Sequence, residues 1–123
     1  MKYFLLILCS LLSSASYSCE SSSQYLKVTA TAYTSSAGET DDSPTITAWG
    51  DVLKPGMNVI AVSRDLIALG LDHGAVVSIK GFKKEFIVAD KMNKRWEKKI
   101  DIYMGNNKQA AKEWGKQKVT ICW

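Results

Sequence analysis

The stretch that decides the fold reads Phe86-Ile87-Val88-Ala89-Asp90, then a polar loop over residues 91–99, then Ile100-Asp101-Ile102-Tyr103. Both runs are apolar and rich in β-branched or aromatic residues, which is typical of short strands. Asp90 ends the first run and Asp101 lies inside the second. Carboxylates at strand ends that face one loop can supply the acid catalyst for a glycosidic bond. More often, such aspartates only accept backbone N–H groups in turns, and the two runs alone leave both interpretations open.

The loop between the two runs is basic and holds one tryptophan. It contains Lys91, Asn93, Lys94, Arg95, Trp96, Lys98 and Lys99. Cations beside an aromatic ring can bind single-stranded nucleic acid, or they can grip a glycan with Trp96 under a sugar ring. The alternative is a solvated charged loop with Trp96 packed into the core.

The rest of the chain outward from this segment reads as short strands separated by turns. Apolar or alternating runs predict strands over residues 26–33, 45–49, 58–63, 76–80, 85–89 and 118–123, in addition to 100–103. Residues 34–44 form a loop, residues 54–57 a turn and residues 64–70 one helical turn. The best helix covers residues 106–114, capped by Asn106 or Asn107 and stopped by Gly115. This pattern predicts a mainly β fold, and it favours a small closed barrel with one short helix near the C-terminus.

The N-terminal segment has the pattern of a secretory signal peptide. Lys2 precedes a short apolar run and then small residues up to Ser18, and the run is too short to span a bilayer. We therefore expect residues 1–18 to be a signal peptide, 19–25 a Ser-rich leader and 26–123 one domain. The expected location is the periplasm or cell envelope, with association with the outer membrane as one option. The net charge of +4 becomes +3 without Lys2, which suits anionic surfaces.

Two cysteines, Cys19 and Cys122, remain after the predicted signal segment. In an oxidising compartment they can pair and close nearly the whole mature chain into a loop. The alternative is a lipid on Cys19, although Ser16 and Tyr17 differ from the residues that usually precede a lipidated cysteine.

The remaining candidate residues are few. Thr31, Tyr33 and Trp49 lie on or near strand ends and can line a groove or pack in the core. His73 is the only histidine, which excludes a zinc site built on several histidines. A histidine-based catalytic triad is disfavoured, because no nucleophile is close to His73 in the sequence. Asp41 and Asp42 are a weak signal for a cation. We expect no metal, no cofactor and no nucleic-acid partner.

Taken in order, several short motifs resemble one known domain family. They are Thr29-Ala30-Thr31-Ala32-Tyr33, Thr47-Ala48-Trp49-Gly50, Lys54-Pro55-Gly56, Ile60-Ala61-Val62-Ser63, Val88-Ala89-Asp90, Ile100-Asp101-Ile102-Tyr103-Met104-Gly105, and Ala111 with Trp114-Gly115. This order and spacing resembles the three-aspartate (3D) domain, one of the RlpA-like double-psi β-barrels. It is also similar to the C-terminal domain of MltA-type membrane-bound lytic transglycosylases. The resemblance runs from about Thr29 to the end of the chain.

The resemblance implies a six-stranded double-psi barrel with a groove for glycan strands. It implies cleavage of the MurNAc–GlcNAc bond of peptidoglycan by a single acid, which corresponds here to Asp101. Asp90 matches the preceding motif aspartate and would support it, while Thr31 and Tyr33 match the first strand. The same carboxylate would then help the C6 hydroxyl of the sugar to attack, which leaves a 1,6-anhydro end.

Two positions depart from the family pattern. Ser63 stands where the family usually has its first aspartate, with Asp65 two residues further on as a possible substitute. Lys91-Met92-Asn93 replaces the usual Thr-Gly-Gly segment, which changes the shape and charge of the expected groove. We therefore expect a peptidoglycan-cleaving enzyme, with a non-catalytic, expansin-like wall-binding module and a protein-interaction module as alternatives. We expect it to act as a monomer.

Overall fold

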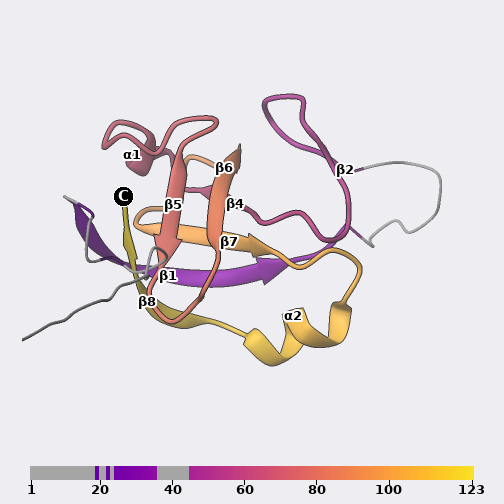
Figure 1. Cartoon of the computed structure of the whole chain (residues 1–123). Coiled ribbons are helices and arrows are strands. Elements are labelled where there is room, and N and C mark those ends of the chain that lie inside the picture. The colour runs from indigo at the N-terminus through magenta and orange to yellow at the C-terminus, as the bar shows by residue number, and fades with distance from the viewer. Residues whose placement is uncertain (1–18, 20–21, 23, 36–44) are drawn as a thin grey trace, which may run out of the picture.

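The structure is a computed structural model that describes residues 19, 22, 24–35 and 45–123 (Figure 1). Its strands and helices are β1 (Tyr25–Tyr33), β2 (Thr45–Ile46), β3 (Val52–Leu53), β4 (Val59–Val62), α1 (Arg64–Ile67), β5 (Val76–Ile79), β6 (Glu85–Lys91), β7 (Lys99–Tyr103), α2 (Lys108–Trp114) and β8 (Gln117–Cys122). The predicted signal peptide, residues 20, 21 and 23 of the leader, and Asp41 and Asp42 lie outside the described residues. No helix in the described part is long and apolar enough to cross a membrane.

Six strands form one sheet that closes on itself. The order of neighbours is β1-β7-β4-β6-β5-β8, and β8 pairs back to β1. The pairs β1–β7 and β4–β6 are parallel, and the other four pairs are antiparallel. β2 and β3 form a separate small hairpin. The predicted mainly β fold is confirmed, with α1 as a second short helix besides the expected one near the C-terminus.

Alternate residues of the strands fill the inside of this sheet with aliphatic side chains and one phenylalanine. The buried cluster consists of Val28, Ala30, Ile60, Val62, Leu66, Leu71, Val77, Ile79, Phe86, Val88, Ile100, Ile102 and Ile121. On β7 the inward residues are Ile100 and Ile102, so Asp101 between them points to the outer face. The period-2 pattern of the sequence thus fixes which side of the sheet carries the carboxylate.

Strand β1 changes neighbours along its length. Its first part pairs with β8, up to Ala30 opposite Gln117, and its second part pairs with β7, from Thr29 opposite Lys99. The Trp114 indole donates to the Ala30 carbonyl over 3.0 Å. α2 therefore packs against β1, and Figure 1 shows it beside β1 and β8. The Asn107 side chain caps α2, as one of the two predicted caps.

The two ends of the domain are tied together. A disulfide joins Cys19 to Cys122, with 5.6 Å between their Cα atoms and 103 positions between them in the sequence. Gln24 and Trp123 exchange backbone hydrogen bonds of 3.1 Å. A cysteine held in this disulfide has no free thiol for a lipid, so the structure corresponds to the predicted pairing of Cys19 with Cys122 and not to lipidation.

The strand predicted over residues 45–49 is wrong beyond Ile46. The Thr47 N–H donates to the Asp51 carbonyl, and the Gly50 N–H donates to the Thr47 carbonyl. These bonds fold residues 47–51 into a tight turn, with Gly50 at a positive φ of 90°. Val52 and Leu53 then form β3, which the sequence did not predict because so short a segment shows no alternation. Trp49 consequently sits in a turn and not on a strand.

Candidate active site

Strand β4 lies between the two strands that carry the aspartates. Its residue Ala61 is opposite Asp101 on β7 and opposite Asp90 on β6. Neighbouring strands lie about 4.8 Å apart, so the Cα atoms of the two aspartates are separated by about 10 Å. The structure thus brings to the same level of the sheet two residues that eleven positions separate in the sequence.

A β-bulge in β6 decides where Asp90 points. Ile60 pairs with Val88, but the next residue, Ala61, pairs with Asp90, so β6 has an extra residue at this point. Strict alternation from the buried Val88 would direct Asp90 into the apolar core. The extra residue, Ala89, restores the outward direction, and such bulges commonly re-aim a side chain. Asp90 and Asp101 therefore share the outer face.

Asp101 has an environment that favours its protonated form. Burial raises the pKa of its carboxyl, and the charge of Asp90 raises it further. A hydrogen bond of 2.9 Å from the Thr31 hydroxyl and the charge of Lys99 act in the opposite direction but do not cancel the effect of burial. Thr31 is directly opposite Asp101 on β1. A carboxyl with a raised pKa is what a general acid requires.

Asp90 has a different environment. Its Oδ1 accepts two backbone hydrogen bonds, one of 2.8 Å from the Ala48 N–H and one of 2.9 Å from the N–H of the adjacent Lys91. Ala48 belongs to the turn that follows β2, so Asp90 fastens this hairpin to the barrel. This is the role of a turn aspartate that accepts backbone N–H groups, the second of the two interpretations of the aspartate pair.

The Asp90 contact gives a testable prediction for stability. Asp90→Ala leaves the Ala48 N–H without its acceptor, and we expect it to lower the free energy of unfolding by about 1–2 kcal/mol. Asp90→Asn keeps a side-chain oxygen and should lose less than half of this. Urea denaturation measures both. Asp72→Ala is the matched control, because among the described residues the exposed Asp72 side chain accepts only the adjacent His73 N–H. Equal losses in all three variants would contradict the assignment.

Tyr33 is the fourth polar group of this face, after Asp101, Thr31 and Asp90. Its hydroxyl is buried and has no hydrogen-bond partner among the described residues. Burial raises the pKa of Tyr33, and the negative charges of Asp90 and Asp101 raise it further, so the phenol stays protonated. Its ring lies 5.4 Å from that of Tyr103, and it packs against an apolar cluster of Leu53, Val59, Ala89 and Tyr103. We call Thr31, Tyr33, Asp90 and Asp101 the aspartate site.

Trp49 lies beside this site, in a contact that the sequence did not suggest. Its indole stacks on the His73 ring with 4.9 Å between centroids and 23° between planes. His73 Nε2 is 2.6 Å from Asp51 Oδ2, and the Lys91 ammonium lies 5.5 Å from the Trp49 centroid. Long stretches of sequence separate these partners, so no local pattern could have paired His73 with the 47–51 turn.

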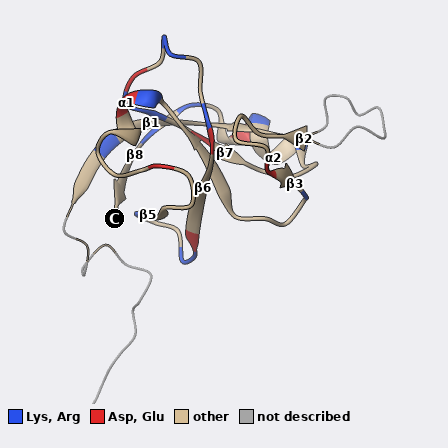
Figure 2. Ribbon diagram, turned by 90° about the horizontal axis from the view of Figure 1, so that it is seen from above, with Lys and Arg blue, Asp and Glu red and all other residues tan. Residues whose placement is uncertain are grey.

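The basic loop places Trp96 at the surface. Trp96 is 37% exposed, so the alternative in which it packs into the core is wrong. The Lys99 ammonium lies 3.6 Å from the ring centroid and the Arg95 guanidinium 5.0 Å. Lys99 is also one of the charges that act on Asp101, so it links the ring to the aspartate site. Basic residues are spread over the ribbon, including Arg64 on α1, and are not confined to this loop (Figure 2).

Three predicted residues hold the loop in place. Asp65 accepts the N–H of Lys98, whose φ of 47° is the left-handed conformation. Asn93 accepts the N–H of Arg95. Ser63 is fully buried, and its hydroxyl accepts the N–H of Lys99 over 3.0 Å. Neither Ser63 nor Asp65 is among the groups that act on Asp101, so these contacts bring no third carboxylate to the aspartate site.

No protein-family model matches this chain, and a search of the curated proteins found no similar one. Among the described residues, no three His, Cys, Asp or Glu side chains gather into a group that could hold a metal ion.

Proposed function

We propose that this chain cleaves the glycan strands of peptidoglycan at the MurNAc–GlcNAc bond as a lytic transglycosylase. The observation that carries the proposal is the environment of Asp101, where burial raises the pKa of the carboxyl and a hydrogen bond from Thr31 holds it in one orientation. The resemblance to the three-aspartate domain assigns the acid to the same residue. We propose further that the closed sheet is a double-psi barrel, which its two parallel and four antiparallel strand pairs support.

The reaction needs one carboxyl group in two successive states. Protonated Asp101 donates its proton to the glycosidic oxygen, and the bond from that oxygen to C1 of MurNAc breaks. The Asp101 carboxylate then accepts the proton of the C6 hydroxyl as this oxygen bonds to C1, which regenerates the acid and gives a 1,6-anhydro end. No water is consumed.

The neighbouring groups have supporting parts in this proposal. The Asp90 charge acts on Asp101 in the direction that keeps it protonated. Burial and the two nearby carboxylates raise the pKa of Tyr33, so its phenol forms a neutral wall of the site. Trp96 with Lys99 offers an aromatic surface and a cation at the edge of the site. The proposed location is the cell envelope after removal of residues 1–18, and the protein would act as a monomer without nucleic acid.

The direct test is a digest of purified peptidoglycan with the mature chain. We expect soluble fragments that end in 1,6-anhydro-MurNAc, identified by mass spectrometry. Fragments with ordinary reducing ends would indicate hydrolysis by water, which requires a second carboxylate to activate it. The absence of any soluble fragment over a range of pH would overturn the catalytic proposal.

A second candidate is a wall-binding module without catalytic activity. It is favoured by Ser63, which replaces the usual first aspartate and is buried in a backbone contact. In this case the chain should sediment with insoluble peptidoglycan and release nothing. Trp96→Ala should weaken the sedimentation, because it removes the exposed ring between two cations. Equal binding by both proteins would contradict this role of Trp96.

A further inference from the structure

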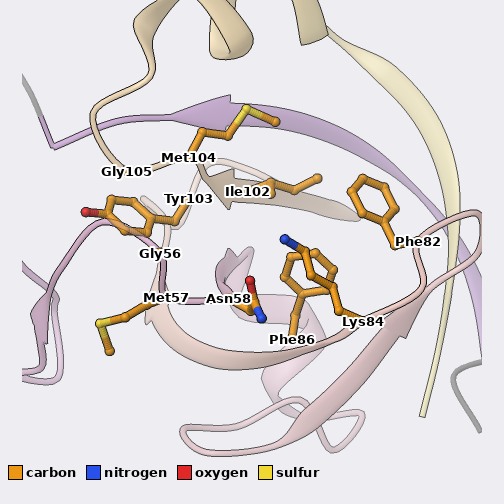
Figure 3. Close-up of a pocket in the computed structure, with 10 residues that line it drawn as sticks. All are labelled: Gly56, Met57, Asn58, Phe82, Lys84, Phe86, Ile102, Tyr103, Met104 and Gly105. Carbon is orange, nitrogen blue, oxygen red and sulfur yellow. The ribbon is translucent and has the colours of Figure 1, made fainter.

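A pocket of about 240 Å³ opens at another part of the barrel, where β4 and β6 begin and β7 ends. Its lining residues are Gly56, Met57, Asn58, Phe82, Lys84, Phe86, Ile102, Tyr103, Met104 and Gly105 (Figure 3). None of the four residues of the aspartate site belongs to this lining. We call it the Lys84 pocket.

The wall of the Lys84 pocket is built from two chain segments in close contact. Gly105 has a φ of +61°, and a Cβ at this position would lie 3.1 Å from Pro55 Cα. The 104–105 segment can therefore approach the 54–57 turn only because residue 105 is glycine. Gly56 also has a positive φ, of +98°, which the same turn requires. The pocket is thus formed by fixed backbone on this side.

Most of the lining is apolar and aromatic. Phe82 and Phe86 meet edge to face with 5.4 Å between centroids, and Ile102 and Met104 come from the segment at the end of β7. Phe86 and Ile102 belong to the buried core, so the floor of the pocket is rigid. Such a lining is suited to the apolar part of a ligand.

Two polar groups enter this apolar space. Figure 3 shows the Lys84 ammonium between Ile102 and Phe86 and the Asn58 amide beside Phe86 with its oxygen toward this space, whereas the Tyr103 hydroxyl points away. The Lys84 ammonium lies 5.7 Å from the Phe86 centroid. Within residues 45–123 and the described part before them, neither the ammonium nor the amide has a hydrogen-bond or ion-pair partner. No carboxylate of the described residues lines the pocket.

We propose that the Lys84 pocket binds a small carboxylate that carries one apolar group. Lys84 supplies the cation for the carboxylate, and the two phenylalanines with Met104 supply the surface for the apolar group. The volume lies below the range of about 300–1,000 Å³ that drug-sized ligands occupy, which limits the ligand to the size of a single amino acid. This proposal does not depend on glycan cleavage at Asp101.

The test uses three probes on the mature, oxidised protein. 3-Phenylpropionate has both required features, 3-phenylpropanamide lacks the charge, and acetate lacks the apolar group. NMR titration of the methionine methyl groups reports binding through Met57 and Met104, which line the pocket. For 3-phenylpropionate we expect a Kd on the order of 1 mM, with both other probes at least about tenfold weaker.

Two variants assign the effect to the pocket. Lys84→Met removes the cation and should weaken 3-phenylpropionate about tenfold or more, while it leaves the affinity for the amide unchanged. Lys83→Met is the matched control, because Lys83 is adjacent but does not line the pocket. Equal affinity for the acid and the amide, equal loss in both variants, or no shift of the methionine signals would each overturn the proposal.

Discussion

Asp101→Asn is expected to reduce the release of anhydro-muropeptides by about 10²–10⁴-fold, because a general acid contributes a factor of this size. Asparagine has nearly the same shape and can still accept the Thr31 hydrogen bond, but it has no proton to donate to the glycosidic oxygen. The measurement is the initial rate of fragment release from purified peptidoglycan. Glu113→Gln on the exposed side of α2 is the control and should keep the wild-type rate.

The pH dependence follows from the direction of the Asp101 pKa shift. The raised pKa keeps the acid protonated at higher pH than an ordinary aspartate, so activity should fall only as the pH rises above this pKa. Thr31→Val removes a hydrogen bond that lowers the pKa, and it should therefore move the fall in activity to higher pH. A fall at unchanged pH in this variant would contradict the role of Thr31.

The stability of Asp101→Asn provides a test that does not need substrate. The folded state binds the Asp101 proton more tightly than the unfolded state, so ionised Asp101 lowers stability above its raised pKa. This penalty disappears as the pH falls through that pKa. Asp101→Asn removes the charge, so we expect it to be at least as stable as the wild type at neutral pH. Thermal unfolding would show whether lost activity reflects lost folding.

Removal of the Cys19–Cys122 disulfide is expected to have the largest effect on stability. It closes a loop across 103 positions, which in the chain-entropy model contributes about 4–5 kcal/mol. For a domain of about 100 residues, this corresponds to a fall in Tm of about 20–30 °C. Cys19→Ala is the preferred variant, because Cys122 is fully buried and replacing it would also alter the core.

Circular dichroism on heating measures this effect. The wild type under reducing conditions should unfold at about the same temperature as Cys19→Ala, and the reductant should not change the Tm of the variant. A variant that unfolds at the temperature of the oxidised wild type would show that the cross-link does not stabilise the domain.

The sequence predicts the strands well where burial follows a period of two over several residues. β1 and β7 are of this kind, whereas β4 is buried at all four residues and is predicted as a short apolar run. α2 is also predicted, because its Asn107 cap and the Gly115 stop are local signals. The turn over residues 47–51 and the strand β3 are not predictable in this way. β2 and β3 are only two residues long, so they show no alternation, and backbone hydrogen bonds within residues 47–51 determine the turn.

The sequence marks four residues that the structure brings together, Thr31, Tyr33, Asp90 and Asp101, but it does not show how they come to share one face. The spacing of Asp90 and Asp101 marks both residues, but only the bulge in β6 shows how Asp90 reaches the outer face. The Ala48 N–H that binds Asp90 comes from 42 positions away, and the His73 partner of Trp49 is also remote, 24 positions along the chain (73 − 49). The Lys84 pocket arises from segments around residues 56, 84 and 104 that only the closed sheet brings together.

The pairing of β1 with both β7 and β8 has a consequence for how the chain folds. β1 can pair with β7 as soon as residues 99–103 are present, but it can pair with β8 only after residues 117–122 have been added. Contacts between such distant segments make folding slow. We therefore expect the pairing of β1 with β8 to be the last step of barrel closure. Until that step, the first half of β1 is an open sheet edge that another chain can pair with.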